Sequence, residues 1–224
     1  MVKMVDSSIL ILIPTFNGVK TLPYLLEDLK NLNYTNIHVV DDGSKDGTGK
    51  FLRDSEFSFS LHKRNLGKGA AILTGAKWAI MNKYNWILTI DADLQHSPAM
   101  ISKFLEFKDE KTMVLGSRKD LTPMPLIRRF SNKFSSLLLS IRSNNLIEDS
   151  QCGFRLIPAK LFMSFNFLCK GFQFESEILI KAIMAGYRII HVEIPTIYNN
   201  EISSMKNIKD TIKFAKMYFH SFIW

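Results

Sequence analysis

The sequence of 224 residues contains few cysteines and no segment that would divide it. Cys152 and Cys169 are too few for a disulfide framework, and their spacing is not that of a zinc site. A reducing, cytoplasmic setting is therefore expected. No stretch rich in Pro, Gly or Ser interrupts the chain, so we expect one domain with one core.

Long apolar runs are also missing. The apolar run at 9–13 stops at Pro14, which is typical of a buried strand rather than of a signal peptide. No run approaches the roughly 18 apolar residues that a membrane-spanning helix requires. Any contact with a membrane is therefore expected at its surface.

Acidic residues are outnumbered. The chain has 29 Lys and Arg against 21 Asp and Glu, a formal net charge of +8, which indicates an anionic partner. Nucleic acid, an acidic membrane surface and a phosphorylated substrate all fit this charge. The basic residues form neither a recognised reading helix nor an aromatic RNA motif, so nucleic-acid binding is disfavoured.

Short β-branched runs alternate with helical patterns along the chain. Buried strands are predicted at 9–13, 37–40, 86–90, 112–115 and 189–194. Leucines at helical spacing follow Pro23, and Leu73, Ala76 and Ile80 repeat that pattern. The alternation predicts an α/β fold with a mostly parallel sheet flanked by helices, in which ligands bind beyond the carboxyl ends of the strands.

An acidic pair follows the predicted strand at 86–90. Asp91 and Asp93 flank one small residue, so strand alternation directs both carboxylates to the same side, and Gln95 adds a neutral oxygen. Such hard oxygen ligands suit Mg²⁺ or Mn²⁺. Taken alone, the pair is explained as well by an ordinary turn at a strand end.

Two further polar segments follow predicted strands. The carboxylates of Asp41 and Asp42 could accept ribose hydroxyls or base N–H groups, or the segment is a plain turn that caps a helix. Residues 65–69 open a helix where backbone N–H groups and Lys68 could meet anionic oxygens, although the full Walker spacing is absent.

In this order and spacing, these segments resemble the family-2 glycosyltransferases. The matching pieces are IPTFN at 13–17, VVDDGSKDGT at 39–48, RNLGKGAA at 64–71 and DADLQH at 91–96. Four later pieces resemble the polyprenyl-phosphate (dolichyl-phosphate) mannosyl and glucosyl transferases: GSR at 116–118, DSQCGFRL at 149–156, FESEIL at 174–179 and EIPTIY at 193–198. The resemblance runs from about Ile9 to Lys213.

The resemblance implies a GT-A, Rossmann-like fold with a donor-binding half at about 1–120 and an acceptor and membrane-facing half at about 121–224. It implies inverting transfer of a hexose from GDP-mannose or UDP-glucose to a polyprenyl or dolichyl phosphate. The metal, Mg²⁺ or Mn²⁺, is expected at Asp91, Asp93 and Gln95. Residues expected near the donor are Pro14, Asn17, Asp41, Asp42, Lys68, Asp91 and, in a loop that closes over it, Lys206.

An acceptor that is already a phosphate needs little help from a general base, so cations that position it become the main requirement. The candidates are Arg118, Arg128, Arg129 and Arg155, of which Arg118 and Arg129 are expected to act in catalysis with Asp93. Each could instead form a surface ion pair of little energetic value. The mannosyl synthases carry a further arginine where this chain has Asn132 and Lys133.

Two alternatives remain open. A family-2 transferase that acts on a glycan hydroxyl would need a carboxylate base, for which Glu175 and Asp149 are candidates. A sugar-nucleotide-binding module without turnover is the other alternative. No zinc site is expected, because none of the five histidines has a partner at ligand spacing, and His96 is expected to belong to its loop rather than to the chemistry.

Two amphipathic stretches, 127–141 and 208–224, are expected in the second half. On the latter, Lys209, Lys213 and Lys216 share a stripe beside Ile212 and Phe219, which is the pattern of an interfacial helix. The former adds a second apolar surface with basic neighbours, containing Phe130, Phe134, Leu137, Leu138 and Ile141. We therefore expect peripheral attachment to the cytoplasmic face of a membrane; core helices with solvated faces are the alternative.

Overall fold

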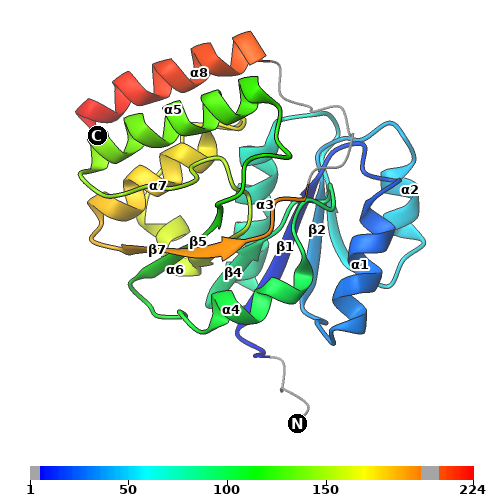
Figure 1. Cartoon of the computed structure of the whole chain (residues 1–224). Coiled ribbons are helices and arrows are strands. Elements are labelled where there is room, and N and C mark those ends of the chain that lie inside the picture. The colour runs from blue at the N-terminus through cyan, green and yellow to red at the C-terminus, as the bar shows by residue number, and fades with distance from the viewer. Residues whose placement is uncertain (1–5, 198–206) are drawn as a thin grey trace.

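A computed structural model describes residues 6–197 and 207–224 (Figure 1). One sheet of seven strands runs through the molecule in the order β3-β2-β1-β4-β6-β5-β7. Its strands are β1 (Ile9–Thr15), β2 (Ile37–Asp41), β3 (Ser58–Leu61), β4 (Trp86–Thr89), β5 (Thr112–Arg118), β6 (Arg155–Pro158) and β7 (Arg188–Ile194). Both halves of the sequence contribute to this sheet.

Helices cover both faces of the sheet. They are α1 (Leu22–Asn31), α2 (Thr48–Arg53), α3 (Lys68–Met81), α4 (Ile101–Leu105), α5 (Leu126–Ser143), α6 (Ala159–Ser164), α7 (Phe174–Met184) and α8 (Asn207–His220). Alternation along β1 divides its side chains between the two faces, because Leu10 and Leu12 pack with α3 and α7, whereas Ile11 and Ile13 pack with α1 and α4. The core is therefore two apolar layers separated by the sheet.

All five predicted strands are present, and the predicted α/β fold is confirmed. Two strands were not predicted. β3 carries serines at the edge of the sheet, and β6 has only four residues and begins with an arginine. Neither has the β-branched run that marks a buried strand.

β6 is antiparallel to both of its neighbours, β4 and β5, while the remaining pairs are parallel. The residues that precede β6 therefore lie at the same end of the sheet as those that follow the parallel strands. We call this end the carboxyl edge. It gathers the segments after β1, β2, β4 and β5 with residues 149–153.

Pro14 lies inside β1 without disturbing the sheet. β1 pairs with β4 only as far as Leu12, opposite Thr89, and the hydrogen bonds of Leu12 point towards β4. Because successive residues alternate sides, Pro14 points the same way but lies beyond the last pair. Its missing N–H therefore removes no hydrogen bond from the sheet.

Candidate active site

The loops after β1 and β2 are fastened together at the carboxyl edge. The Asn17 N–H donates to Ser44 Oγ (2.7 Å), and Asn17 Oδ1 accepts from the Lys45 N–H (2.9 Å). The Gly18 N–H donates to Thr48 Oγ1 (3.0 Å). Asn17 has a φ of 55°, a left-handed conformation that these bonds hold in place. The two loops predicted to contact the donor therefore form one unit.

Asp42 holds the loop between β3 and α3, which contains His62, Leu66 and Gly67. Its buried carboxylate accepts from His62 Nδ1 (2.7 Å), the Leu66 N–H (2.8 Å) and the Gly67 N–H (2.7 Å). The protein thus supplies three donors to the group that the sequence predicted as a nucleoside ligand. This geometry favours a structural role for Asp42.

Asp41 lies instead beside a polar cleft of about 280 Å³. Oδ1 accepts from the Ser44 N–H (3.0 Å) and hydroxyl, and Oδ2 lies near Gly49, where an added Cβ would come within 3.1 Å of it. Glycines and basic residues line the cleft: Gly43, Gly47, Gly49, Lys45, Lys50, Arg53 and Lys63. The cleft is large enough for part of a nucleotide.

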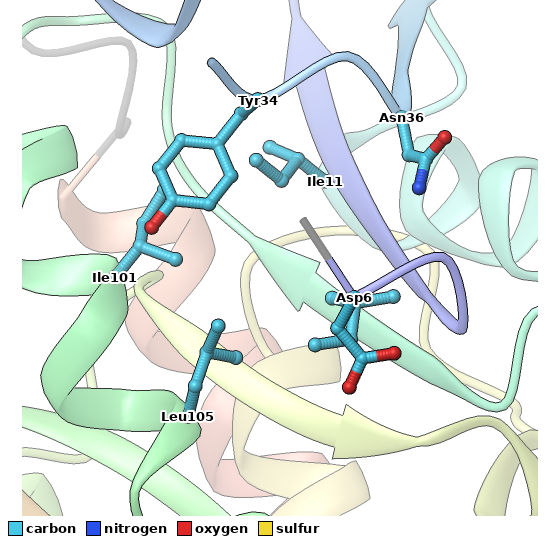
Figure 2. A pocket seen from close by; sticks show the side chains of 7 residues that line it. Asp6, Ile11, Tyr34, Asn36, Ile101 and Leu105 are labelled. Carbon is cyan, nitrogen blue, oxygen red and sulfur yellow. The ribbon is translucent and has the colours of Figure 1, made fainter. Parts of the chain in front are cut away.

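A second pocket lies at the opposite end of the sheet, where β1 begins (Figure 2). Tyr34, Ile101 and Leu105 surround Ile11 and Asp6 there. Its volume of about 10 Å³ admits no more than a water molecule. This pocket is therefore not a substrate site.

Asp91 is paired with Lys68. Lys68 Nζ lies 2.7 Å from Oδ1 and 2.9 Å from Oδ2 of Asp91, and 2.8 Å from Glu175 Oε1. Burial alone would raise the pKa of Asp91, but the Lys68 ammonium leaves it below its ordinary value. Burial likewise acts to lower the pKa of Lys68, and the two carboxylates outweigh it, so Lys68 stays charged.

Gly153, just before β6, packs directly against this ion pair. A Cβ at this position would lie 2.3 Å from Asp91 Oδ2 and 2.7 Å from Lys68 Nζ. The hydroxyl of Thr89 donates to the Gly153 carbonyl (2.7 Å), which ties the segment to the end of β4. The approach leaves room for glycine only.

Asp93 and Gln95 lie on a tight turn after Asp91. Asp93 Oδ1 accepts from the Gln95 N–H (3.0 Å), and Leu94 between them has a φ of 58°. Three other non-glycine residues with positive φ, Asn33, Lys83 and Asn144, end helices, where this conformation is ordinary. Leu94 ends no helix, so the strain belongs to the loop that carries the acidic pair.

Two carboxylates and one amide on this turn form a set of hard oxygen donors that suits Mg²⁺ or Mn²⁺. In the part of the chain that the structure describes, no three His, Cys, Asp or Glu side chains are grouped to hold a metal ion. A metal here would consequently depend on Gln95 and on oxygens of a ligand as well as on the carboxylates. Asp91 would share its charge between the metal and Lys68.

His96 lies closer to the site than the sequence indicated. Its buried ring packs on Phe154, with ring centres 5.5 Å apart, and Nε2 is 4.0 Å from Asp91 Oδ2. Nδ1 has no hydrogen-bond partner among the described residues. Burial lowers the pKa of His96 to about 4, so the ring is neutral at pH 7.

Arg118, at the end of β5, forms a two-pronged ion pair with buried Asp149. Nε lies 2.6 Å from Oδ2 and Nη2 3.0 Å from Oδ1, and Asn132 Nδ2 donates to the same Oδ1 (2.9 Å). Burial would raise the pKa of Asp149, yet Arg118 keeps it below its usual value. The charge of Arg118 also helps to lower the pKa of Asp91, so the two ion pairs belong to one site.

Arg155 does not face this site. It is 1% exposed and donates to three backbone carbonyls, those of Cys152 (2.8 Å), Glu175 (2.6 Å) and Ser150 (2.7 Å). All three guanidinium nitrogens are thus used to join β6, the loop before it and α7. The predicted role of Arg155 in binding the acceptor phosphate is not supported by this position.

The arginine pair at the start of α5 is half-buried. Arg129 Nη2 donates to the carbonyls of Thr122 (3.1 Å) and Met124 (3.2 Å), which fixes the loop before the helix. Arg128 precedes it on the same turn. Lys206 lies outside the described residues.

The structure also shows what the glutamates of α7 do. Glu175 is the second partner of Lys68, and fully buried Glu177 accepts from the Cys169 N–H (2.7 Å) and from Lys181 Nζ (2.6 Å). The loop held by Glu177 presents the Lys170 carbonyl to the Ala70 N–H (3.0 Å) at the start of α3. Two acidic residues at the start of a mainly apolar helix were the sequence signal for this role.

Residues 10–167 match the model of glycosyl transferase family 2. The chain belongs to this family. Among its family-2 relatives is UDP-N-acetylglucosamine--dolichyl-phosphate N-acetylglucosaminyltransferase of Methanococcus voltae, which is 32% identical over 96% of this chain and 95% of the relative. Undecaprenyl-phosphate mannosyltransferase of Micrococcus luteus is 27% identical over 88% of this chain and 86% of the relative.

The fold agrees with that of solved structures. Glucosyl-3-phosphoglycerate synthase from Mycobacterium tuberculosis, in complex with Mn²⁺, UDP-glucose and phosphoglyceric acid, superposes with a TM-score of 0.75 at 14% identity, over 95% of this chain and 79% of that one. The likeness confirms the predicted GT-A fold. The family match ends before α7, so Glu175 and Lys181 lie beyond it.

Proposed function

We propose that this glycosyltransferase transfers a hexose, with inversion, from GDP-mannose or UDP-glucose to a polyprenyl or dolichyl phosphate. The observation that carries the proposal is that both carboxylates available as a base are already paired. Asp149 is held by Arg118 and Asn132, and Glu175 by Lys68. A sugar hydroxyl would need a base to attack, whereas a phosphate oxygen does not.

The relatives support the same class of acceptor. The Methanococcus voltae protein is named for dolichyl phosphate and the Micrococcus luteus protein for undecaprenyl phosphate. Their names differ in the sugar, since one transfers N-acetylglucosamine and the other mannose. The donor of this chain therefore has to be found by experiment.

On the donor side, we place the nucleoside in the cleft beside Asp41. Pro14 and Asn17 are proposed as further donor contacts. Asp91, Asp93 and Gln95 would hold Mg²⁺ or Mn²⁺, which neutralises the diphosphate as it leaves. Lys68, kept charged at this position, adds a second cation. Lys206 is proposed as a further donor contact.

On the acceptor side, we place the lipid phosphate between Arg118 and the start of α5, where Arg128 or Arg129 adds positive charge. Asp149 occupies Nε and Nη2 of Arg118, while Nη1 makes no hydrogen bond to the described residues. The pairing fixes the plane of the guanidinium, and a fixed plane orients the attacking oxygen. The acceptor would be reached at the cytoplasmic face of a membrane, to which the protein attaches peripherally.

The test is a panel of donors with polyprenyl phosphate in detergent and with Mn²⁺ or Mg²⁺ added. GDP-mannose, UDP-glucose and UDP-N-acetylglucosamine are offered separately, and lipid-linked sugar is measured. Formation of one lipid-linked sugar is expected. Transfer to soluble saccharides but not to lipid phosphate would replace the proposal by a hydroxyl-directed transferase. Nucleotide binding without any transfer, and unchanged by Asp93→Ala, would indicate a binding module.

A further inference from the structure

Helix α5 has its polar and apolar sides reversed. Its buried residues are Asn132, Ser135, Ser136 and Leu139, so three of the four are polar. The large apolar side chains point outwards and are between 51% and 74% exposed: Leu126, Ile127, Phe130, Phe134, Leu137 and Ile141. A helix that faces water has the opposite arrangement. Contiguous apolar surface of this kind marks a contact with another phase or molecule.

The buried polar side of α5 is hydrogen-bonded to residues 149 and 150, the segment before β6. Asn132 donates to Asp149 (2.9 Å), Ser136 Oγ accepts from the Ser150 N–H (2.9 Å), and the hydroxyls of Ser135 and Ser150 are 3.0 Å apart. Turning the helix to bury its apolar side would break all these bonds. These hydrogen bonds, one of which holds Asp149, the partner of Arg118, therefore keep the apolar side of α5 facing outwards.

Helix α8 continues this surface. α5 and α8 run side by side along one side of the molecule (Figure 1). Arg142 Nε near the end of α5 donates to Oγ of Ser221, which directly follows α8 (3.0 Å). The Arg142 guanidinium also lies over the ring of Phe222, 4.8 Å from its centre. Exposed apolar side chains of this segment are Ile212, Phe219, Phe222 and Ile223. We call the exposed apolar residues of 126–141 and 212–223 the α5–α8 surface.

The two helices that carry this surface are rich in basic residues. The basic residues of the two helices are Arg128, Arg129, Lys133, Arg142, Lys209, Lys213 and Lys216, and Asp210 is their single carboxylate. Their formal charge is therefore +6, out of +8 for the whole chain. A second copy of the chain would bring like charge to the contact. An occupant that is both apolar and anionic fits better.

We propose that the α5–α8 surface docks on a bilayer that contains anionic lipids. The phenylalanine and leucine side chains enter the boundary between headgroups and acyl chains, and the basic side chains meet anionic headgroups. α5 then separates the bilayer on its outer side from the Arg118–Asp149 pair on its inner side. The inference rests on the proposed function in one respect: the lipid acceptor reaches the site from this side.

Sedimentation with vesicles tests the docking. The full chain is mixed with vesicles of phosphatidylcholine alone and of phosphatidylcholine with phosphatidylglycerol. We expect binding to the anionic vesicles and a loss of at least about tenfold for F130S/F134S, whose side chains are 72% and 51% exposed. Lys133→Gln with Lys216→Gln should weaken binding by about fivefold per lysine and reduce its salt dependence. The matched control is Tyr24→Ser on α1, an aromatic side chain 62% exposed, which should bind as the unaltered chain does.

Activity in detergent separates this inference from the proposed function. If F130S/F134S transfers sugar normally in detergent but binds vesicles poorly, the fold is intact and the docking surface is supported. Vesicle binding that depends on these residues, with no transfer from any donor, supports the surface and removes the proposed function alone. Binding that ignores these residues overturns the inference. A second result would also overturn it: light scattering detects a dimer, F130S/F134S dissociates that dimer, and the chain does not bind vesicles.

Discussion

The acidic carboxyl edge and helix α5 both bury polar side chains, but they satisfy them differently. At the edge, each buried charge has a fixed counterpart, Lys68 for Asp91 and backbone N–H groups for Asp42. Inside α5 the fully buried side chains are neutral, whereas Lys133 is exposed and Arg128, Arg129 and Arg142 are half-buried.

The difference indicates two ways of holding an anion. If a diphosphate and a metal bind at this edge as proposed, the charges there are already fixed and need little reorganisation. The neutral hydrogen bonds on the buried side of α5 hold Asp149, which in turn orients Arg118, while Lys133 remains exposed on the same helix. Changes around Asp91 should therefore affect the donor, and changes at the Arg118–Asp149 pair beside α5 should affect the acceptor.

The largest effect is expected for Asp93→Asn. The amide keeps an oxygen that can accept from the Gln95 N–H, so the turn should survive. Loss of a charged metal ligand removes several kcal/mol of stabilisation from the leaving diphosphate, which lowers kcat/KM on the order of 10³-fold. Transfer assayed against Mn²⁺ concentration measures this. Glu56→Gln, a carboxylate exposed to 66% in a surface ion pair, is the control, and equal rates in the two variants would contradict the metal assignment.

Arg118→Lys should affect the acceptor next most strongly. Lysine keeps the charge but cannot hold both oxygens of Asp149 in a plane. Loss of orientation should lower kcat/KM for the lipid phosphate by about 10²-fold and leave the KM of the donor nearly unchanged. Lys119→Gln, next to it in an exposed ion pair, is the matched control. An equal loss of donor affinity would break the distinction between the two sides.

Gly153→Ala should act on the donor although the residue comes from the second half. Its Cβ would come within 2.3 Å of Asp91 Oδ2, so the carboxylate or the loop must move. We expect about tenfold weaker nucleotide binding with Mn²⁺ by calorimetry and a cost of about 1–3 kcal/mol in stability. Gly171→Ala, which meets only the flexible end of Gln173, should bind normally. Unchanged binding in Gly153→Ala would mean that the contact is not maintained in solution.

The smallest effect on activity is expected from His38, in β2. Burial lowers its pKa to about 4 from 6.5, so between these values the unfolded chain binds the proton and the folded chain does not. Stability is therefore lost as pH falls from 6.5 to 4, by about 1.4 kcal/mol per pH unit for this histidine. His38→Asn should remove the His38 part of the slope in urea unfolding, about 1.4 kcal/mol per pH unit, and leave the part from His96, whose pKa burial also lowers to about 4. The stability that Asp149 provides is lost only below this pH range, because its pKa in the folded chain lies below 3.8. A slope that His38→Asn leaves unchanged would contradict this assignment.

The sequence predicted the elements that carry strong local patterns. β1 and β4 are short runs of mostly apolar residues, and the acidic pair follows β4 where the pattern placed it. The sequence did not separate Asp41 from Asp42, or Arg118 from Arg155, because their roles depend on which neighbour donates to them. Lys68 and Glu175 meet only through packing of α7 on α3, which no local spacing encodes. The sequence did not predict β6, because its four residues begin with an arginine and contain no β-branched run; the strand is defined by its pairing with β4 and β5.

The reversed strand β6 also determines what can fold alone. It lies between β4 and β5, and the hydrogen bond from Thr89 to Gly153 joins residues 64 positions apart. A fragment ending near residue 120 would leave one edge of β4 unpaired and one side of Asp91 without its neighbour. Exposed strand edges of this kind promote aggregation. The proposed donor and acceptor halves are therefore not expected to fold separately, and we expect neither half to bind its ligand without the other.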